Sequence, residues 1–456
     1  MTAWLERLND GRNVWYGTEK VEHLASHHAF KGTVATIEKL LTLSNEALYI
    51  EGRHASFHIP KNIEQLQKKQ HAYEIWVDET FGMMSRLSEY SREIETGWYA
   101  NRRQIATYIP HFEEKIIRRY NDSKEHELLS TAAAQDLQRK RSQSAVEVAS
   151  GQLRIVKKTE EGVIVRGAKT IATAAPYVDE YIISSFHPRS AEQKSLANIF
   201  LIPANLAGLQ IISRASFASD DKVNQPLSAR FDEMDAVLLF EDVLIPWEYV
   251  LVHEDPEAAW KLQQDPVAGA LSQHQTVVRL VRKLTAVAAL ANRLASEADI
   301  TSFLHVQNEL ATLFSQIEVI KALLQTAQQT GQLIKGVYLP NKQYLATARN
   351  LGTTYYPKAI EIIQKLSASG LLQAPATLEL FDVHPEWHSY FEGASLNGYD
   401  RTLLNKVAWD LVGSQLGARH ELYERFYSGD PVRTYANYYK QHTKKEAWQQ
   451  FATSIL

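Results

Sequence analysis

The sequence predicts an α+β protein in which helical regions at both ends of the chain flank a separate β unit. Long runs of mixed polar and apolar residues with few Gly or Pro fill residues 1 to about 130. Short segments rich in Val and Ile then recur between turn residues from Gln152 to Val252. Beyond Asp255 the apolar residues return to helical spacing. Helices, then strands, then a long helical block favour this arrangement.

The N-terminal helical region contains "SRLSEY", residues 85 to 90, which also looks helical. On a helix, Arg86 and Tyr90 would lie on one face, so both side chains could reach the same point. An exposed Arg and Tyr on a helix need no function, however. The spacing alone leaves open whether the pair decorates the surface or points into a pocket.

The β region is built from strand-like segments, which are "LRIVKK", "VIVRGAK", "YIISSF", "NIFLIP", "LQIIS" and "AVLLFEDVLIP". Within "RGAKTIATAAPYVDEY" small residues leave room for a flat ligand against the backbone. Thr173 could offer its hydroxyl to a ring nitrogen there, although Thr is also a good strand former. In a further segment, Asp232, Glu233 and Asp235 come directly before an apolar strand. A polar loop that leads into a buried strand is sufficient to explain these three acidic residues.

The C-terminal region carries two apolar stripes at helical spacing. One consists of Leu310, Leu313, Phe314, Ile317, Ile320 and Leu324, and the other of Val277, Leu280, Val281 and Leu284. Further on, Gly413 and Gly417 lie in a predicted helix pair and allow close approach of the backbones. Helix packing explains these glycines almost as well as ligand binding does.

Composition and missing motifs exclude several kinds of function. The formal net charge of −4 and the 22% of charged residues argue against a nucleic-acid partner. Without cysteine there are no disulfides, thiolate metal sites, iron–sulfur clusters or Cys nucleophile, and we expect no metal site. No GxGxxG follows a predicted strand, and no P-loop or GxSxG motif occurs. No apolar run reaches the roughly 18 residues of a membrane span, so we expect a cytoplasmic protein without membrane contact.

Four segments, in order along the chain, resemble those of one enzyme family. They are "RGAKTIAT", "SARFDEMDAVLLFEDVLIPWEYVLV", "NGYD" and "GARHELYER". Over most of its length the chain resembles the oxygenase component of two-component flavin-dependent aromatic monooxygenases, the family of 4-hydroxyphenylacetate 3-monooxygenase and chlorophenol monooxygenase. This resemblance implies an acyl-CoA dehydrogenase-like fold. We therefore expect an N-terminal α-helical domain over residues 1–131, a middle β-barrel domain over 132–258 and a C-terminal helical bundle over 259–456 that forms a homotetramer.

The resemblance also implies the chemistry. The cofactor is expected to be FAD, received as FADH2 from a separate flavin reductase. Bound reduced flavin would react with O2 to give a C4a-hydroperoxide, which hydroxylates a phenol or a similar small, electron-rich aromatic substrate. Such a site has to exclude water and stabilise negative charge on the phenol oxygen, and a nearby cation meets the second need.

Individual residues follow from the same resemblance. "SRLSEY" is similar to the family's Arg-x-x-x-Tyr, which implies that Arg86 faces phenol and peroxide and that Tyr90 is its hydrogen-bonding neighbour. Thr173 corresponds to a catalytic threonine beside flavin N5, and Ser185 is expected to bind substrate together with the Arg-Tyr pair. The residues expected to bind the cofactor are Gln138, Arg141, Ile171, Ala172, Thr173, Ala174, Gly413, Ser414, Gln415 and Leu416.

Two departures from the family pattern concern the phenol site. The hydroxyphenylacetate enzymes carry a histidine that binds the phenol oxygen, and this chain has Thr131 or Ala132 there. The chlorophenol branch uses a histidine that resembles His274, which would be either the general base or a structural residue at a helix entry. Ala174 stands where the family often has Gly, which narrows the space over the flavin.

Alternatives remain beside the hydroxylase. The missing histidine fits a degenerate, non-catalytic flavin-binding member of the family. An acyl-CoA dehydratase of the same fold needs cysteine ligands, which the chain lacks. An acyl-CoA dehydrogenase needs a catalytic carboxylate that cannot be located in the sequence.

Overall fold

The computed structural model describes residues 3–137 and 151–456 of the chain. These residues form two compact units. The first extends up to Gln275 and includes Leu333–Leu339, and the second consists of Thr276–Gln332 and Pro340–Leu456. The domain boundaries expected at residues 131 and 258 both fall within the first unit and stay a prediction.

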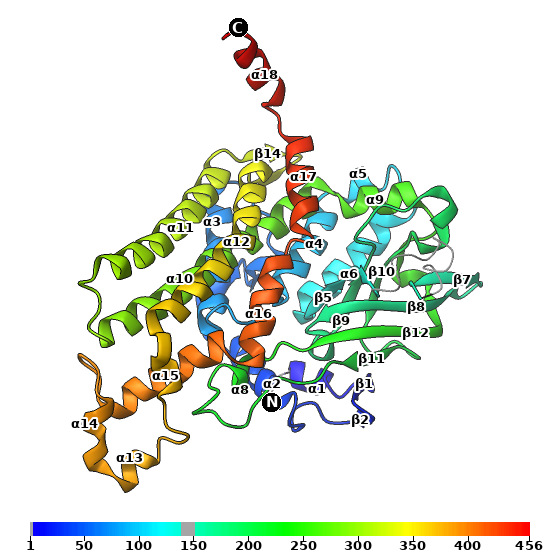
Figure 1. Ribbon diagram of the computed structural model, residues 1–456. Coiled ribbons are helices and arrows are strands. Elements are labelled where there is room, and N and C mark those ends of the chain that lie inside the picture. The colour runs from blue at the N-terminus through cyan, green and yellow to red at the C-terminus, as the bar shows by residue number, and fades with distance from the viewer. Residues whose placement is uncertain (1–2, 138–150) are drawn as a thin grey trace. The chain divides into compact units, whose positions relative to one another are not determined.

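Two sheets form the β part of the first unit (Figure 1). In order across it, the seven-stranded sheet contains β2 (Glu19–Val21), β1 (Asn13–Tyr16), β11 (Gln210–Ser213), β12 (Asp235–Pro246), β8 (Gly162–Thr173) and β6 (Gln135–Asp136), with β7 (Arg154–Lys158) also paired to β8. The four-stranded sheet contains β13 (Val250–Val252), β10 (Ile199–Pro203), β9 (Glu180–Ile183) and β5 (Ser130–Ala133). Two small hairpins pair β3 (Tyr49–Ile50) with β4 (Arg53–His54) and β14 (Gln332–Ile334) with β15 (Val337–Leu339).

The long antiparallel strands β8 and β12 run side by side at the centre of the larger sheet (Figure 1). Their Val and Ile residues alternate into the interior, where Val163, Val165 and Ile245 are completely buried. The strand-like segments of the β region are confirmed, because each lies in one of the strands β7 to β12. The prediction that the N-terminal region is helical throughout is wrong at β1 and β2. These two strands join the larger sheet, where β1 pairs in parallel with β11.

Helices complete the first unit. They are α1 (Ala3–Arg7), α2 (Lys31–Leu41), α3 (Ile63–Glu79), α4 (Glu89–Ala100), α5 (Arg102–Ile105), α6 (Phe112–His126), α8 (Ser228–Phe231), α9 (Pro256–Gln263) and the start of α10 (Pro266–Glu297). Short 3-10 turns are η1 (Glu46–Leu48), η2 (Ala55–Phe57), η3 (Ala175–Tyr177), η4 (Ala191–Leu196) and η5 (Trp247–Tyr249). Side chains of Asn62 and Asp255 cap α3 and α9 by accepting backbone N–H groups. The α4 residue Trp98 packs in a buried cluster with Ile182 and Leu201 of the smaller sheet.

The second unit is helical. It contains the rest of α10, then α11 (Leu304–Gln329), α12 (Lys342–Ser367), η6 (Ala368–Leu372), α13 (Leu380–Val383), η7 (Pro385–Trp387), α14 (His388–Phe391), α15 (Gly398–Val412), α16 (Gln415–Phe426), α17 (Pro431–Gln441) and α18 (Lys445–Thr453). The stripe predicted on α10 is buried, as is the stripe on α11 with one exception. Phe314 is 46% exposed, because a helix rotates by about 100° per residue and the buried α11 stripe is narrower than the sequence pattern.

A buried ion cluster lies within this helical unit. The Glu424 carboxylate accepts hydrogen bonds from both terminal nitrogens of Arg279, at 2.7 and 2.9 Å, and from Lys283 Nζ at 2.9 Å. Burial lowers the pKa of Lys283 to about 8, against the attraction of Glu424. Within the interior, the negative charge and acceptor oxygens of Glu424 are therefore paired with the positive charges and N–H donors of Arg279 and Lys283.

Membrane-spanning helices and metal-binding clusters are both absent from the described part of the chain. None of its helices is both long and apolar enough to cross a membrane. Among the same residues, no group of three or more His, Asp or Glu side chains is arranged to hold a metal ion.

Candidate active site

Arg86 and Tyr90 meet at the start of α4. The Arg86 guanidinium carbon lies 4.2 Å from the centre of the Tyr90 ring, a cation–π contact between two half-buried side chains. The helical interpretation of "SRLSEY" is wrong, since α4 begins only at Glu89 and Arg86 lies in the preceding turn. The predicted Arg86–Tyr90 contact thus exists, but it joins a residue of the preceding turn to a residue in the first turn of α4.

Glu233 holds the turn that carries Arg86. Its Oε1 accepts the backbone N–H of Arg86 at 2.7 Å, and its Oε2 accepts the backbone N–H of Ser85 at 3.0 Å. Glu233 and Ser85 are almost completely buried. A carboxylate that binds two successive amides away from water fixes the path of this backbone.

The end of β8, Ile171 to Ala174, has an unusual backbone. Ile171 has φ 53° and Ala174 has φ 65°, a region that costs side chains with a Cβ about 1 to 2 kcal/mol per residue. The register of β8 against β12 also shifts here, between Ala236 and Leu238, so that a bulge forms. Ile171 is 49% exposed, although it is an isoleucine. Strain and bulges of this kind are frequent beside functional sites.

Thr173 is held inside this strained segment. Its hydroxyl donates to Oδ1 of Asp235 at 2.7 Å, and its carbonyl accepts the hydroxyl of Thr131 at 2.8 Å. A hydroxyl that donates to a carboxylate can offer only its lone pairs to another group. Thr173 is therefore set to accept a hydrogen bond, as an N–H of a reduced flavin ring would require.

One four-residue segment, Asp232 to Asp235, contacts both parts of the site. Glu233 binds the Arg86 turn, the carbonyl of Met234 accepts the N–H of Ala174 at 2.8 Å, and Asp235 binds Thr173. Arg214 ties the segment together, at 2.6 Å from Asp232 and 2.9 Å from Asp235. The sequence analysis explained this segment as an ordinary loop and did not predict these contacts. The sequence signal that could have indicated them is the presence of three carboxylates within four positions before a buried strand.

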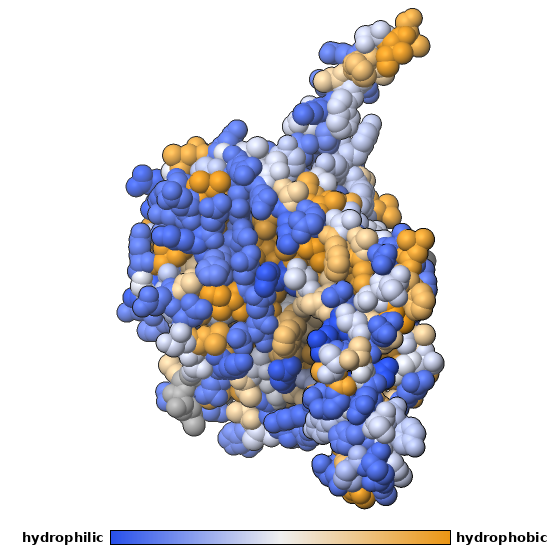
Figure 2. Space-filling model, turned by 90° about the vertical axis from the view of Figure 1, so that its left-hand side faces the viewer, coloured by the Kyte–Doolittle hydropathy of each residue, from blue (hydrophilic) through white to orange (hydrophobic). Residues whose placement is uncertain are grey.

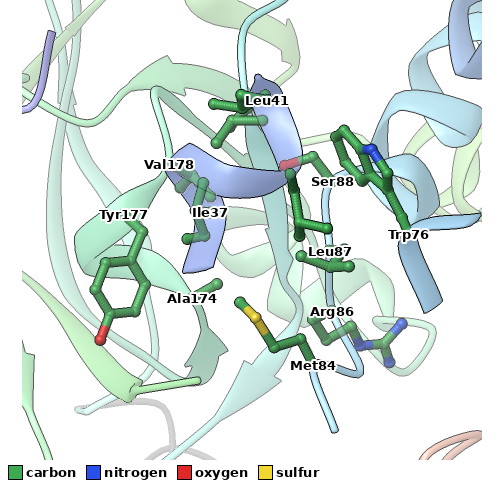
Figure 3. A pocket seen from close by; sticks show the side chains of 12 residues that line it. Ile37, Leu41, Trp76, Met84, Arg86, Leu87, Ser88, Ala174, Tyr177 and Val178 are labelled. Carbon is green, nitrogen blue, oxygen red and sulfur yellow. The ribbon is translucent and has the colours of Figure 1, made fainter. Parts of the chain in front are cut away.

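A small apolar cavity lies behind the Arg86 turn (Figure 3). Its walls come from Ile37, Leu40, Leu41, Trp76, Met84, Arg86, Leu87, Ser88, Leu129, Ala174, Tyr177 and Val178. Its volume is about 20 Å³, which is room for about one water molecule. In Figure 3 the guanidinium of Arg86 points away from the space between Ile37, Leu87 and Ala174.

His274 and Thr131 do not supply an obvious base. His274 is completely buried in α10, 6.4 Å from the ring of Tyr73, and is not among the residues that line the cavity. Burial, with a contribution from Lys69, lowers its pKa to about 3, so the neutral imidazole is a weak base. Thr131 is one of the two residues, with Ala132, expected at the place of the missing family histidine, and its hydroxyl donates to the backbone carbonyl of Thr173.

The substrate residue predicted at Ser185 belongs to a separate polar cluster. Ser185 Oγ accepts from Arg189 Nε at 3.3 Å, and Arg189 also binds Asp136 and Gln152. Lys169 donates to the same Asp136 at 2.7 Å. Within the described part of the chain, the hydrogen bonds of Ser185 go to Leu196 and Arg189 and not to the Arg86 turn.

The remaining predicted cofactor residues are Gln138, Arg141 and the four residues from Gly413 to Leu416. Gln138 and Arg141 fall outside the described residues. Gly413 and Ser414 join α15 to α16 in the helical unit, and Gln415 and Leu416 begin α16, whose N-cap Ser414 accepts the N–H of Gly417 through Oγ at 3.0 Å. A Cβ on Gly417 would lie 2.2 Å from the carbonyl oxygen of Leu411, which confirms the close backbone approach expected there. These four residues and the Arg86 turn belong to different units.

The segment from Ile171 to Ala174 fits one side of a flat ring system. Ala172 and Ala174 have small side chains, Ile171 offers exposed apolar surface, and Thr173 offers an oriented acceptor. An isoalloxazine ring needs this combination of flat apolar contact and a polar group near its central nitrogens.

Comparison with known proteins identifies the family. The model of the 4-hydroxyphenylacetate 3-hydroxylase N-terminal part matches residues 1–252, and the model of its C-terminal part matches residues 267–455. The chain belongs to the 4-hydroxyphenylacetate 3-hydroxylase family. This confirms the resemblance read from the four sequence segments.

Individual relatives cover nearly the whole chain. The 4-hydroxyphenylacetate 3-monooxygenase oxygenase component of Thermus thermophilus is 33% identical over 95% of this chain and 92% of its own length. A monooxygenase of Streptomyces globisporus that acts on a carrier-bound 3-chloro-4-hydroxyphenyl β-amino acid is 29% identical, over 99% of this chain and 90% of its own. The crystal structure of a 4-hydroxyphenylacetate 3-monooxygenase oxygenase component with FAD superposes with a TM-score of 0.92, at 31% identity, over 99% of this chain and 97% of that one.

These comparisons confirm the acyl-CoA dehydrogenase-like fold predicted for the chain. They also confirm the predicted enzyme class, the oxygenase component of a flavin-dependent aromatic monooxygenase, and FAD as its cofactor.

Proposed function

We propose that this chain hydroxylates a small phenol at the Arg86 turn, using O2 and FADH2 that a separate reductase supplies. The observation that carries the proposal is the placement of Arg86. Its guanidinium stacks on Tyr90, and Glu233 fixes its backbone. A guanidinium combines a permanent positive charge with five N–H donors in one plane, and such a group suits an oxyanion.

Arg86 and Tyr90 would act on the phenol. Bound FADH2 supplies the electrons that activate O2. The fixed positive charge of Arg86 favours the phenolate form of the substrate and so makes the ring more nucleophilic. Tyr90 keeps the guanidinium in one orientation through the cation–π contact. Thr173, which Asp235 orients, would accept an N–H of the flavin ring.

The substrate class is a phenol that binds without a histidine partner. Thr131 or Ala132 stands in place of the family histidine; the Thr131 hydroxyl already donates to the Thr173 carbonyl, and Ala132 offers no polar side chain. The cation at Arg86 then carries the stabilisation of the phenolate, which favours phenols that lose their proton readily. Both a free phenol and a carrier-bound phenol, as in the Streptomyces relative, suit this chemistry.

The assembly proposed for the chain is a homotetramer. Support comes from α18, whose residues Trp448 and Phe451 share one helix face and are 58% and 70% exposed, and from Ile455 just beyond the helix, which is 73% exposed. The hydrophobic tip that bears the C-terminus stands out at the top of Figure 2. A second copy of the chain would cover such a face. A chain shortened after Gln441 should therefore have a smaller mass in multi-angle light scattering, and an unchanged mass would contradict the role of α18. A cytoplasmic location remains part of the proposal.

The test supplies chemically reduced FAD and O2 to the pure protein with a panel of phenols, including 4-hydroxyphenylacetate. We expect a hydroxylated product from at least one phenol, and tighter binding of FADH2 than of oxidised FAD under anaerobic conditions. If FADH2 is oxidised with H2O2 as the sole product and binds no tighter than FAD, the chain is a non-catalytic flavin-binding member of the family. That outcome would remove the hydroxylase proposal.

A further inference from the structure

We infer that Glu233 is a positioning residue for the hydroxylation, because it sets the place of Arg86 through two backbone amides. This inference rests on the proposed function of Arg86. Glu233 lies 147 positions further along the chain and touches the backbone of the Arg86 turn. The contact therefore leaves no trace in the local sequence around "SRLSEY".

The turn needs an external acceptor. Ser85 and Arg86 lie in the turn before α4, outside the backbone hydrogen-bond ladder of that helix. Upstream, the chain reverses at Phe81 and Gly82, both at positive φ, with the N–H of Gly82 bound to the carbonyl of Val77 at 2.9 Å. Buried N–H groups are paired in nearly all native structures. Glu233 supplies that pairing at 2.7 and 3.0 Å.

The position of Glu233 is fixed by the contacts of its neighbour Asp232. The hydroxyl of Thr33 donates to the carbonyl of Asp232 at 3.0 Å. The Asp232 carboxylate accepts from Arg214 at 2.6 Å and from the N–H of Phe217 at 2.7 Å. Glu233 is thus a carboxylate on a fixed loop, and it transmits that position to the backbone it binds.

The same loop also fixes Thr173. Asp235 accepts the Thr173 hydroxyl, and Met234 accepts the N–H of Ala174. The separation of the phenol-binding cation from the flavin-facing threonine is therefore set by one short segment. A displacement of about 1 Å between reacting groups can cost about 100-fold in rate, so this arrangement bears directly on the reaction.

The first experiment measures hydrogen exchange in the full-length apoprotein. In Glu233→Gln, one amide of the turn faces the new NH2 group instead of an oxygen. We expect the peptide that covers Met84–Leu87 to exchange at least about 10-fold faster than in the parent protein. The matched control is Glu93→Gln, which changes an equally buried glutamate that binds Lys69 and Tyr73. The control should leave exchange in Met84–Leu87 unchanged relative to other peptides of the first unit.

The second experiment measures coupling, the product formed per FADH2 oxidised. Glu233→Gln should lower coupling about 10- to 100-fold and raise H2O2, with the Kd for FADH2 unchanged within about 3-fold. Glu233→Asp keeps the charge but shortens the side chain, and should give an intermediate loss. In an Arg86→Ala background, Glu233→Gln should lower coupling no further, because both changes act on the same cation.

These measurements separate the two proposals. Unchanged exchange in Met84–Leu87, or full coupling in a folded Glu233→Gln protein, would overturn the positioning role. A further loss of coupling in the Arg86→Ala background would also overturn it. If Arg86→Ala alone hydroxylates normally, the proposed function of Arg86 fails, whereas the exchange experiment still tests the contact of Glu233. Should Glu233→Gln not fold, Glu233→Asp provides both readouts.

Discussion

The hydroxyl of Thr173 donates to the carboxylate of Asp235 at 2.7 Å, which turns its oxygen into a fixed acceptor at the strained end of β8. Asp235 is itself bound by Arg214 Nε at 2.9 Å. The orientation of the threonine thus depends on an ion pair that lies outside the flavin-binding residues. In the proposed site, this relationship would let a common strand-forming residue act at the cofactor.

Thr173→Val should weaken the binding of FADH2 by about 10-fold, because one hydrogen bond is worth about 1 kcal/mol and the Asp235 carboxylate also loses its donor. Thr173→Ser keeps the hydroxyl and should bind FADH2 within about 3-fold of the parent protein. Anaerobic titration followed by flavin fluorescence measures both variants. Equal affinities of the valine and serine variants would show that the hydroxyl does not contact the flavin.

Ile171→Asn should stabilise the apoprotein and weaken cofactor binding. Asparagine tolerates a positive φ better than a β-branched residue does, so the change should raise the free energy of unfolding by up to about 1 kcal/mol. It also removes exposed apolar surface that the flavin would cover. Denaturant unfolding of the apoprotein and FAD titration test the two effects. A variant that binds FAD as tightly as the parent would remove Ile171 from the cofactor site.

Glu89→Gln should change how stability depends on pH. Burial raises the pKa of Glu89 to about 7; its own backbone N–H and Arg92 oppose the rise, and the nearby Glu233 carboxylate adds to it. The folded state therefore holds this proton more tightly than the unfolded chain does. The stability that this proton contributes is fully present below about pH 4.5 and is lost as the pH rises through about 7.

The variant should consequently lose less stability than the parent protein between pH 5 and pH 8, by on the order of 3 kcal/mol. Urea unfolding midpoints at the two pH values measure the difference. Glu93 and Glu95 have pKa values that burial also raises to about 7, so part of the pH dependence should remain. The exposed Glu64→Gln serves as control, and an identical pH dependence in all three proteins would contradict the assignment to Glu89.

His274→Ala should leave the pH dependence of hydroxylation unchanged. With a pKa lowered to about 3 by burial, His274 stays neutral throughout the working range and does not titrate there. The variant should still lose stability, since the change empties a completely buried site. Profiles of kcat/KM from pH 6 to pH 9 check this expectation. A profile that loses one titration step in the variant would restore His274 as the base.

The parts of the structure that could be predicted are those that depend on the pattern of neighbouring residues in the sequence. Runs of Val and Ile between turn residues identified the strands β7 to β12, and helical spacing identified the buried side of α11. The turn at Arg86 was missed because its conformation depends on Glu233, and no local pattern around residue 86 reports that distant acceptor. The role of the Asp232–Asp235 segment was missed for the same reason. Acidic residues before a strand look like an ordinary loop until their partners are known.

In the proposed reaction, Arg86 directs oxygen from O2 onto a phenol. A single turnover of FADH2-loaded protein with 18O2 tests it most directly, by mass spectrometry of the product from a phenol that the panel identifies as a substrate. The parent protein should yield a hydroxylated product that contains one 18O atom. The exposed-arginine control Arg103→Ala should do the same. Arg86→Ala should oxidise FADH2 but form about 100-fold less product. Undiminished labelled product from Arg86→Ala, or product without 18O from the parent protein, would contradict the account.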